Sequence, residues 1–129
     1  MKIDTKRVPR IFPVGIACTQ LSHVADIDLE PDEMVTFETG GKLEYDVCRK
    51  SWGYYATPSL GGRLRTFGWR AAVMRNIDTR HCFVVLVQEG MEDDWKAYMI
   101  SERQELVMWI DDFETLSRMP AAASSMMDR

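Results

Sequence analysis

The sequence lacks the signatures of the most readily recognised functional classes. It has only two histidines and no GxSxG elbow, so no nucleophilic triad is indicated. No GxxxxGK[ST] and no GxGxxG is present, so no known phosphate-cradling loop is indicated. We predict no cofactor and no metal, and we assign no catalytic residue. A zinc site would require distant segments to meet, because its candidate ligands are scattered over Cys18, His23, Cys48, His81 and Cys82.

Long apolar runs are also absent. The longest, from Cys82 to Val87, is far too short to span a bilayer. Residues 1–9 are charged and lack the apolar stretch of a secretory signal. Three scattered cysteines without a CxxC pair are typical of a reducing compartment. We therefore expect a cytoplasmic protein without a membrane partner.

The composition is that of an ordinary folded domain. The 129 residues are 46% hydrophobic and 28% charged. A chain of this length buries roughly two thirds of its unfolded surface without disulfides or metal. No internal repeat divides the sequence. The expected organisation is a flexible N-terminal arm over residues 1–9, a single globular domain over residues 10–119 and a disordered C-terminal tail over residues 120–129.

Alternating apolar residues predict a β-hairpin in the first half of the domain. Residues 35–37 and 43–47 alternate in this way, and residues 39–42 between them have turn chemistry. Residues 10–16 are mostly residue types that favour strands, but a proline and a glycine interrupt them. This pattern favours an edge strand or an extended segment. Residues 18–28 do not distinguish a short strand from a turn.

The second half predicts strands that alternate with helices. Residues 69–74 alternate as a strand does, and residues 81–88 have an apolar core typical of a central strand covered on both faces. Residues 89–103 repeat apolar side chains at helical spacing, with acids in the first turn. Residues 105–110 predict another short strand, and the connection before them is long enough for a parallel βαβ crossover.

Asp111 and Glu114 have the spacing of a capping box that opens a last short helix. Together these elements predict an α+β fold. Its sheet is expected to be mixed, mostly antiparallel and built from hairpins, with two helices packed on one face.

Charge is distributed unevenly along the chain. The net charge of −4 argues against a general nucleic-acid binder, because such domains are usually basic overall. The stretch from Arg49 to Arg80 nevertheless holds seven of the sixteen basic residues and one acid, Asp78. Residues 11–48 hold eight acids and one base. The basic stretch is either a binding face for an anion or one side of internal salt bridges to its acidic flanks.

Basic and aromatic side chains alternate within this stretch, around a loop rich in glycine and proline. Guanidinium groups bind phosphate and carboxylate in bidentate fashion, and aromatic faces stack on sugars or bases. Gly61 and Gly62 would let backbone amides approach an anion. Both predicted helices begin with acids, which repel phosphate, so we expect the anion site on the loop. The candidate ligand-binding residues are Arg49, Lys50, Trp52, Tyr54, Tyr55, Arg63 and Arg65.

We therefore expect a small cytoplasmic binding or accessory domain. Its partner would be an anionic small molecule, such as a nucleotide or a sugar phosphate, or an acidic protein surface. One alternative is an enzyme acting on a phosphorylated or nucleotide-linked metabolite, which needs a base such as His23 or an acid of residues 26–46. A second alternative is single-stranded nucleic-acid binding by stacking.

The sequence permits two further interpretations, one of a buried and one of an exposed surface. The aromatic residues of the basic stretch can instead belong to the core, with its arginines paired to the acids of residues 26–46. An exposed edge near residues 10–16 is a candidate surface for homodimerisation.

Overall fold

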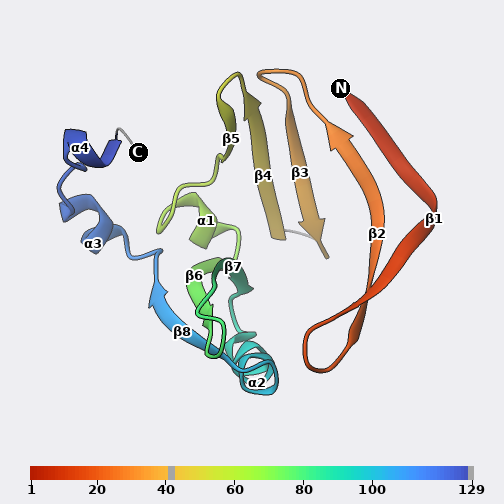
Figure 1. Cartoon of the computed structure of the whole chain (residues 1–129). Coiled ribbons are helices and arrows are strands. Elements are labelled where there is room, and N and C mark those ends of the chain that lie inside the picture. The colour runs from red at the N-terminus through yellow and green to blue at the C-terminus, as the bar shows by residue number, and fades with distance from the viewer. Residues whose placement is uncertain (41–42, 128–129) are drawn as a thin grey trace.

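The computed structural model describes residues 1–40 and 43–127. The chain has an α+β fold of hairpin-built, mostly antiparallel strands, which confirms the predicted class (Figure 1). The strands are divided among three small sheets, with strand orders β1-β2, β3-β4-β5 and β7-β6-β8. Short helices lie beside the third sheet and along the C-terminal part of the chain.

The first sheet is a long hairpin of β1 (Lys2–Val14) and β2 (Thr19–Asp28). Residues 1–9, expected to be a flexible arm, therefore lie in a paired strand, with Ile3 opposite Ile27. The register shifts between Thr5 and Arg10, and Pro9 falls within this irregularity. A residue without an N–H group is tolerated there because the ladder is already interrupted. This is why a proline did not end the strand.

The tip of this hairpin is attached to the rest of the chain by a buried carboxylate. Glu102 is 7% exposed and accepts hydrogen bonds from the amides of Ile16 at 2.5 Å and Ala17 at 3.1 Å. Gly15 has a φ of +73°, and a Cβ atom there would lie 2.5 Å from the Glu102 carboxylate. Glycine is therefore required for the turn to approach this acid.

The second sheet contains β3 (Met34–Thr39), β4 (Leu43–Lys50) and β5 (Gly53–Ala56). The hairpin predicted from alternation is confirmed, with Val35 opposite Val47 and Phe37 opposite Tyr45. Its predicted turn extends into residues 41–42, which lie outside the described residues. The loop expected over residues 48–62 contains the end of β4 and all of β5, because a tight turn at residues 51–52 lets the chain pair again at once.

The third sheet contains β6 (Trp69–Asn76), β7 (Cys82–Gln88) and β8 (Gln104–Trp109). The prediction that residues 81–88 form a central strand is wrong, because β6 lies in the middle and β7 at an edge. Side-chain size explains the order. Ala71 and Ala72 of β6 are at most 1% exposed, whereas Val84 of β7 is 72% exposed. Small side chains allow close packing on both faces of the middle strand.

The helix α2 (Glu92–Ser101) is confirmed as the connection between β7 and β8. Both strands are antiparallel to β6 and therefore parallel to each other, so the expected crossover exists with β6 between its two strands. Trp95 of α2 packs against Trp109 of β8, with ring centroids 5.3 Å apart. The helix thus covers the sheet face that carries Trp109.

The remaining helices are short: α1 (Arg63–Thr66), α3 (Phe113–Arg118) and α4 (Ser124–Met127). The last of these lies in the segment expected to be a disordered tail, of which residues 128–129 lie outside the described residues. The N-cap of α3 is Asp112 and not Asp111, which corrects the predicted capping box. None of the helices in the described part of the chain has the length and apolar character needed to cross a membrane.

Candidate functional site

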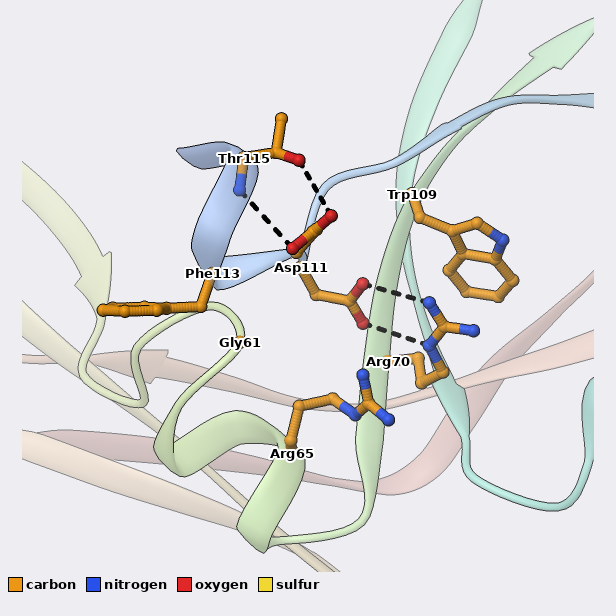
Figure 2. Close-up of a pocket in the computed structure, with 8 residues that line it drawn as sticks. Gly61, Arg65, Arg70, Trp109, Asp111, Phe113 and Thr115 are labelled. Atoms are coloured by element: carbon orange, nitrogen blue, oxygen red, sulfur yellow. Dashed lines mark hydrogen bonds and ion pairs between the residues drawn. The ribbon is translucent and has the colours of Figure 1, made fainter. Parts of the chain in front are cut away.

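A cavity of about 430 Å³ lies where α1, β6 and the connection from β8 to α3 meet (Figure 2). It combines two arginines of the basic stretch with residues from the C-terminal part of the chain. Its lining consists of Gly61, Arg65, Arg70, Trp109, Asp111, Asp112, Phe113 and Thr115.

A buried ion pair between Arg70 and Asp111 forms one wall of this cavity. The Asp111 side chain is 1% exposed, and that of Arg70 is 26% exposed. The guanidinium donates from Nε to Oδ2 at 3.3 Å and from Nη2 to Oδ1 at 3.2 Å, and the amide of Ala71 donates to Oδ2 at 3.0 Å. This bidentate geometry satisfies the buried carboxylate. Asp111 therefore joins β6 to the start of α3.

The same guanidinium lies over the indole ring of Trp109, with Cζ 3.7 Å from the ring centroid. Cation–π contact and the bidentate pair together hold the plane of Arg70 in one orientation. The bonds to Asp111 use the Nε and Nη2 edge, which leaves Nη1 on the opposite edge. Arg70 is thus a rigid donor at the cavity wall.

Gly61 brings the loop before α1 against the backbone that enters α3. Its φ is +71°, and a Cβ atom there would lie 2.6 Å from the carbonyl oxygen of Asp111 and 2.7 Å from the nitrogen of Phe113. Only glycine permits this approach. The glycine pair was predicted to approach an anion, but Gly61 closes on the protein's own backbone, and the amide of Gly62 bonds to the carbonyl of Ser59 at 3.2 Å.

Asp112 uses its carboxylate to cap α3. It accepts from the amides of Glu114 at 3.1 Å and Thr115 at 3.4 Å, and from the Thr115 hydroxyl at 2.8 Å. The hydroxyl bond and then the amide bond from Thr115 hold the pKa of Asp112 below its ordinary value of 3.8. Both carboxylates of the cavity are therefore engaged by protein donors.

Arg65 is the least constrained cation of the cavity. Its side chain is 41% exposed, and its ion pair with Glu89 has a nitrogen–oxygen distance of 3.9 Å, at the outer limit for such a pair. In Figure 2 the Arg65 side chain rises from α1 toward the pair formed by Arg70 and Asp111. It is the more exposed of the two arginines that line the cavity.

The seven predicted ligand-binding residues lie in two separate places. Arg65 alone among them lines the cavity. Arg63, on the same helix, donates to Oδ2 of the buried Asp46 at 3.2 Å and to the hydroxyl of Thr57 at 3.0 Å. It therefore holds α1 against the second sheet. The other five residues lie on β4, on β5 and in the turn between them: Arg49, Lys50, Trp52, Tyr54 and Tyr55.

These five residues lie at the exposed end of the second sheet, with Tyr54 and Arg49 on one face and Tyr55 and Lys50 on the other. We call the stacked pair Trp52 and Tyr55 the aromatic platform. Trp52 and Tyr55 stack with ring centroids 6.1 Å apart and are 72% and 43% exposed, so they are not core residues. The guanidinium of Arg49 lies 5.5 Å from the ring centroid of Tyr54. A hydrogen bond from Lys50 to Asp32 at 2.6 Å raises the pKa of the lysine.

The expected internal salt bridges therefore exist in part. Lys50 and Arg63 pair with acids of residues 26–46, whereas Arg70 and Arg75 pair with acids near the C-terminus, and Arg75 reaches Glu105 at 3.2 Å. Among the aromatic residues also considered for the core, Trp69 is half-buried and donates from Nε1 to the carbonyl of Glu44 at 2.9 Å.

Residues proposed as a general base lie away from the cavity lining. His23 is on β2, with Nε2 2.9 Å from Asp26. Lys6, at 2.7 Å from Asp26, is the main cause of a lowered Asp26 pKa. All three cysteines are free. Across residues 1–40 and 43–127, no cluster of three or more His, Cys, Asp or Glu is placed to hold a metal ion.

Comparison with known proteins found no match: no protein-family model, no curated protein and no solved structure is similar to this chain. The cavity residues that the sequence analysis did not include among the candidates are Arg70, Trp109, Asp111, Asp112, Phe113 and Thr115. Asp111 and Asp112 directly follow an apolar strand, and this was the available signal. Asp111 was interpreted as the helix cap, a function that Asp112 has instead.

Proposed function

We propose that this chain is a small binding domain whose cavity between α1 and α3 holds the anionic group of a small molecule. The observation that carries this proposal is the position of Arg65, which lines the cavity while its own ion pair to Glu89 is at 3.9 Å. A phosphate or carboxylate in the cavity would replace that weak pair with direct guanidinium hydrogen bonds.

Arg70 supports the proposal as a second, preorganised donor. Asp111 and Trp109 hold its guanidinium plane in place, so little side-chain entropy is lost when a ligand binds. The two aspartates of the cavity balance the two arginines in formal charge. Their oxygens are occupied by Arg70, Ala71 and the cap of α3, so the donors that face a ligand belong to the arginines.

Cavity size and lining favour a single-ring metabolite, such as a sugar phosphate or a nucleoside monophosphate. A volume of about 430 Å³ lies within the range of small-molecule sites. The ring of Phe113 is part of the lining and is 63% exposed, which offers a face for a sugar or a base. Binding is favoured over catalysis because both carboxylates of the lining are held by protein donors.

Replacing Arg65 by alanine is expected to weaken binding of ribose 5-phosphate or AMP about 10- to 100-fold, since a hydrogen bond to a charged group contributes about 1.5–3 kcal/mol. Isothermal titration calorimetry measures this change. Arg49→Ala is the matched control, because it removes the same charge from the second sheet, outside the cavity lining, and should leave affinity within about twofold. Equal losses in both variants would instead indicate nonspecific attraction to positive charge.

A second candidate function is stacking of single-stranded bases on the aromatic platform. The observation in its favour is the stacked and solvent-exposed ring pair of Trp52 and Tyr55, on the face of the sheet that carries Lys50. Exposed aromatic rings next to cations are the usual components of a base-stacking surface.

For this second candidate, Trp52→Ala is expected to weaken binding of a short deoxythymidine oligonucleotide at least about fivefold, because stacking contributes about 1–3 kcal/mol per base. Fluorescence anisotropy at two salt concentrations is the measurement. Phe113→Ala removes an exposed ring from the cavity instead and should have no effect on the oligonucleotide. The candidate fails if the oligonucleotide does not bind at low salt, or if Trp52→Ala binds it as the unmodified chain does.

A further inference from the structure

The β1–β2 hairpin exposes apolar side chains that its own chain leaves uncovered. Val8, Ile11 and Val24 are 87%, 62% and 56% exposed. Ile11 lies directly opposite Ser22, and Val24 follows Ser22 by two residues on the same strand. The side chains of Ile11 and Val24 therefore lie on one face of the ribbon. We call Ile11 and Val24 the outer hairpin face; the highly exposed Val8 lies next to it, within the register irregularity of β1. An isolated two-stranded ribbon is marginal in water, so this surface requires a partner.

The opposite face of the hairpin is directed toward its own chain. Val14 and Leu21 lie on that face and line a cavity of about 250 Å³ together with Tyr98 of α2. Figure 1 shows the hairpin at the outside of the molecule, with its tip near α2. Glu102 holds that tip through the amides of Ile16 and Ala17. The outer hairpin face therefore points away from its own chain.

A second uncovered apolar surface lies on the third sheet. Val73 pairs with Val84 on one side and with Met108 on the other, so the three side chains share a face. α2 packs on the opposite face, which carries Trp109. Val84 is 72% exposed and Met108 is 43% exposed. We call these three residues the open sheet face; it continues to the unpaired edge of β7.

The total exposed area indicates how large the missing partner is. The chain exposes 9581 Å², whereas a compact monomer of 14.9 kDa exposes about 7,000 Å². Each chain thus has an excess of about 2,600 Å², or roughly 5,000 Å² for two copies. Stable homodimer interfaces bury about 2,000–5,000 Å² in total. One further copy of the chain is therefore sufficient to cover the excess.

We propose that the chain forms a two-fold symmetric homodimer in which the outer hairpin face of each copy packs on the open sheet face of the other. Both surfaces lie on the same chain, so a two-fold axis places the hairpin face of each copy on the sheet face of the other. All four surfaces are then covered, and the assembly is a closed dimer. The hairpin acts as an arm whose tip stays attached through Glu102 while its outer apolar face contacts the partner. This inference is independent of the proposed ligand.

The first test is the molecular mass of the full chain in solution. Sedimentation equilibrium at micromolar concentration should give twice the 14.9 kDa of one chain. Ile11→Lys and Val84→Glu should each give the mass of a single chain with an unchanged circular dichroism spectrum, because both side chains are more than half exposed within one copy. Ile100→Lys is the matched control, since Ile100 of α2 is 79% exposed and belongs to neither face.

Mixing the two variants tests which surfaces meet. A heterodimer of Ile11→Lys with Val84→Glu contains one unmodified contact and one contact that pairs lysine with glutamate. The mixture should therefore recover the dimer mass that each variant loses alone. An unmodified chain that stays monomeric overturns the proposal, as does a dimer that survives both substitutions. A mixture that stays monomeric overturns the pairing of hairpin with sheet.

A measurement without substitutions covers the case in which a variant does not fold. Hydrogen exchange of the unmodified protein should be slower in β7 and in residues 8–11 at high protein concentration than after dilution to the monomer. Exchange rates in these segments that do not depend on concentration would also contradict the proposal.

Discussion

Replacing Arg70 by alanine is expected to lower the free energy of unfolding by about 3–5 kcal/mol, since removing one partner of a buried ion pair leaves the other charge uncompensated. The charge left behind is the carboxylate of Asp111, whose side chain is 1% exposed in the folded protein. The substitution also removes the cation–π contact with Trp109. Urea denaturation monitored by tryptophan fluorescence measures the change.

Arg75→Ala is the matched control on the same strand. It removes the same charge from β6, but its partner Glu105 has a side chain that is 35% exposed. A pair with this much access to water typically contributes up to about 1 kcal/mol. Combining Arg70→Ala with Asp111→Ala should recover part of the lost stability, because no buried charge then remains. Equal losses for Arg70→Ala and Arg75→Ala would contradict the structural role given to Asp111.

Leu64→Ala is expected to lower the free energy of unfolding by about 2–5 kcal/mol, the range for deletion of a buried leucine side chain. Leu64 is 1% exposed and belongs to the four-residue helix α1. A helix this short has little stability of its own, so packing of this one side chain holds it in place. Because Arg65 follows directly on the same helix, the variant should also lose ligand affinity. Thermal denaturation and calorimetry report the two effects.

Leu60→Ala provides the comparison for this second prediction. Leu60 lies in the loop before α1 and is 38% exposed, so the same substitution should cost less than about 1 kcal/mol. It should also leave the position of Arg65 unchanged. If Leu64→Ala is as mild as Leu60→Ala, then α1 is held by the ion pair from Arg63 to Asp46 and not by its buried leucine.

The candidate site shows how far local sequence signals extend. Enrichment of arginine in residues 49–80 placed Arg65 among the candidate ligand-binding residues, and Arg65 lines the cavity. The same enrichment grouped Arg65 with Arg49 and Trp52, which the fold places on the second sheet. The chain leaves the second sheet after β5 and enters α1, which separates Arg65 from the other candidates, so one predicted face became two surfaces.

The sequence by itself determined the elements whose signals are local. Alternation specified the hairpin of β3 and β4, and helical spacing specified α2. Alternation did not specify which face of the hairpin is buried, because the buried residues of β4 are Asp46 and Cys48 and not its alternating apolar side chains. Their combination also determined the α+β class and the crossover from β7 to β8.

Only the tertiary structure decided which strand lies in the middle of a sheet and which acid is buried. β7 is more apolar than β6 but lies at an edge, because the alanines of β6 fit between neighbours on both sides. Asp111 and Asp112 are adjacent residues of the same type, yet Asp111 is buried against Arg70 and Asp112 caps α3 in solvent. These outcomes depend on contacts between residues about 40 positions apart, such as Ala71 with Asp111, and no local pattern encodes them.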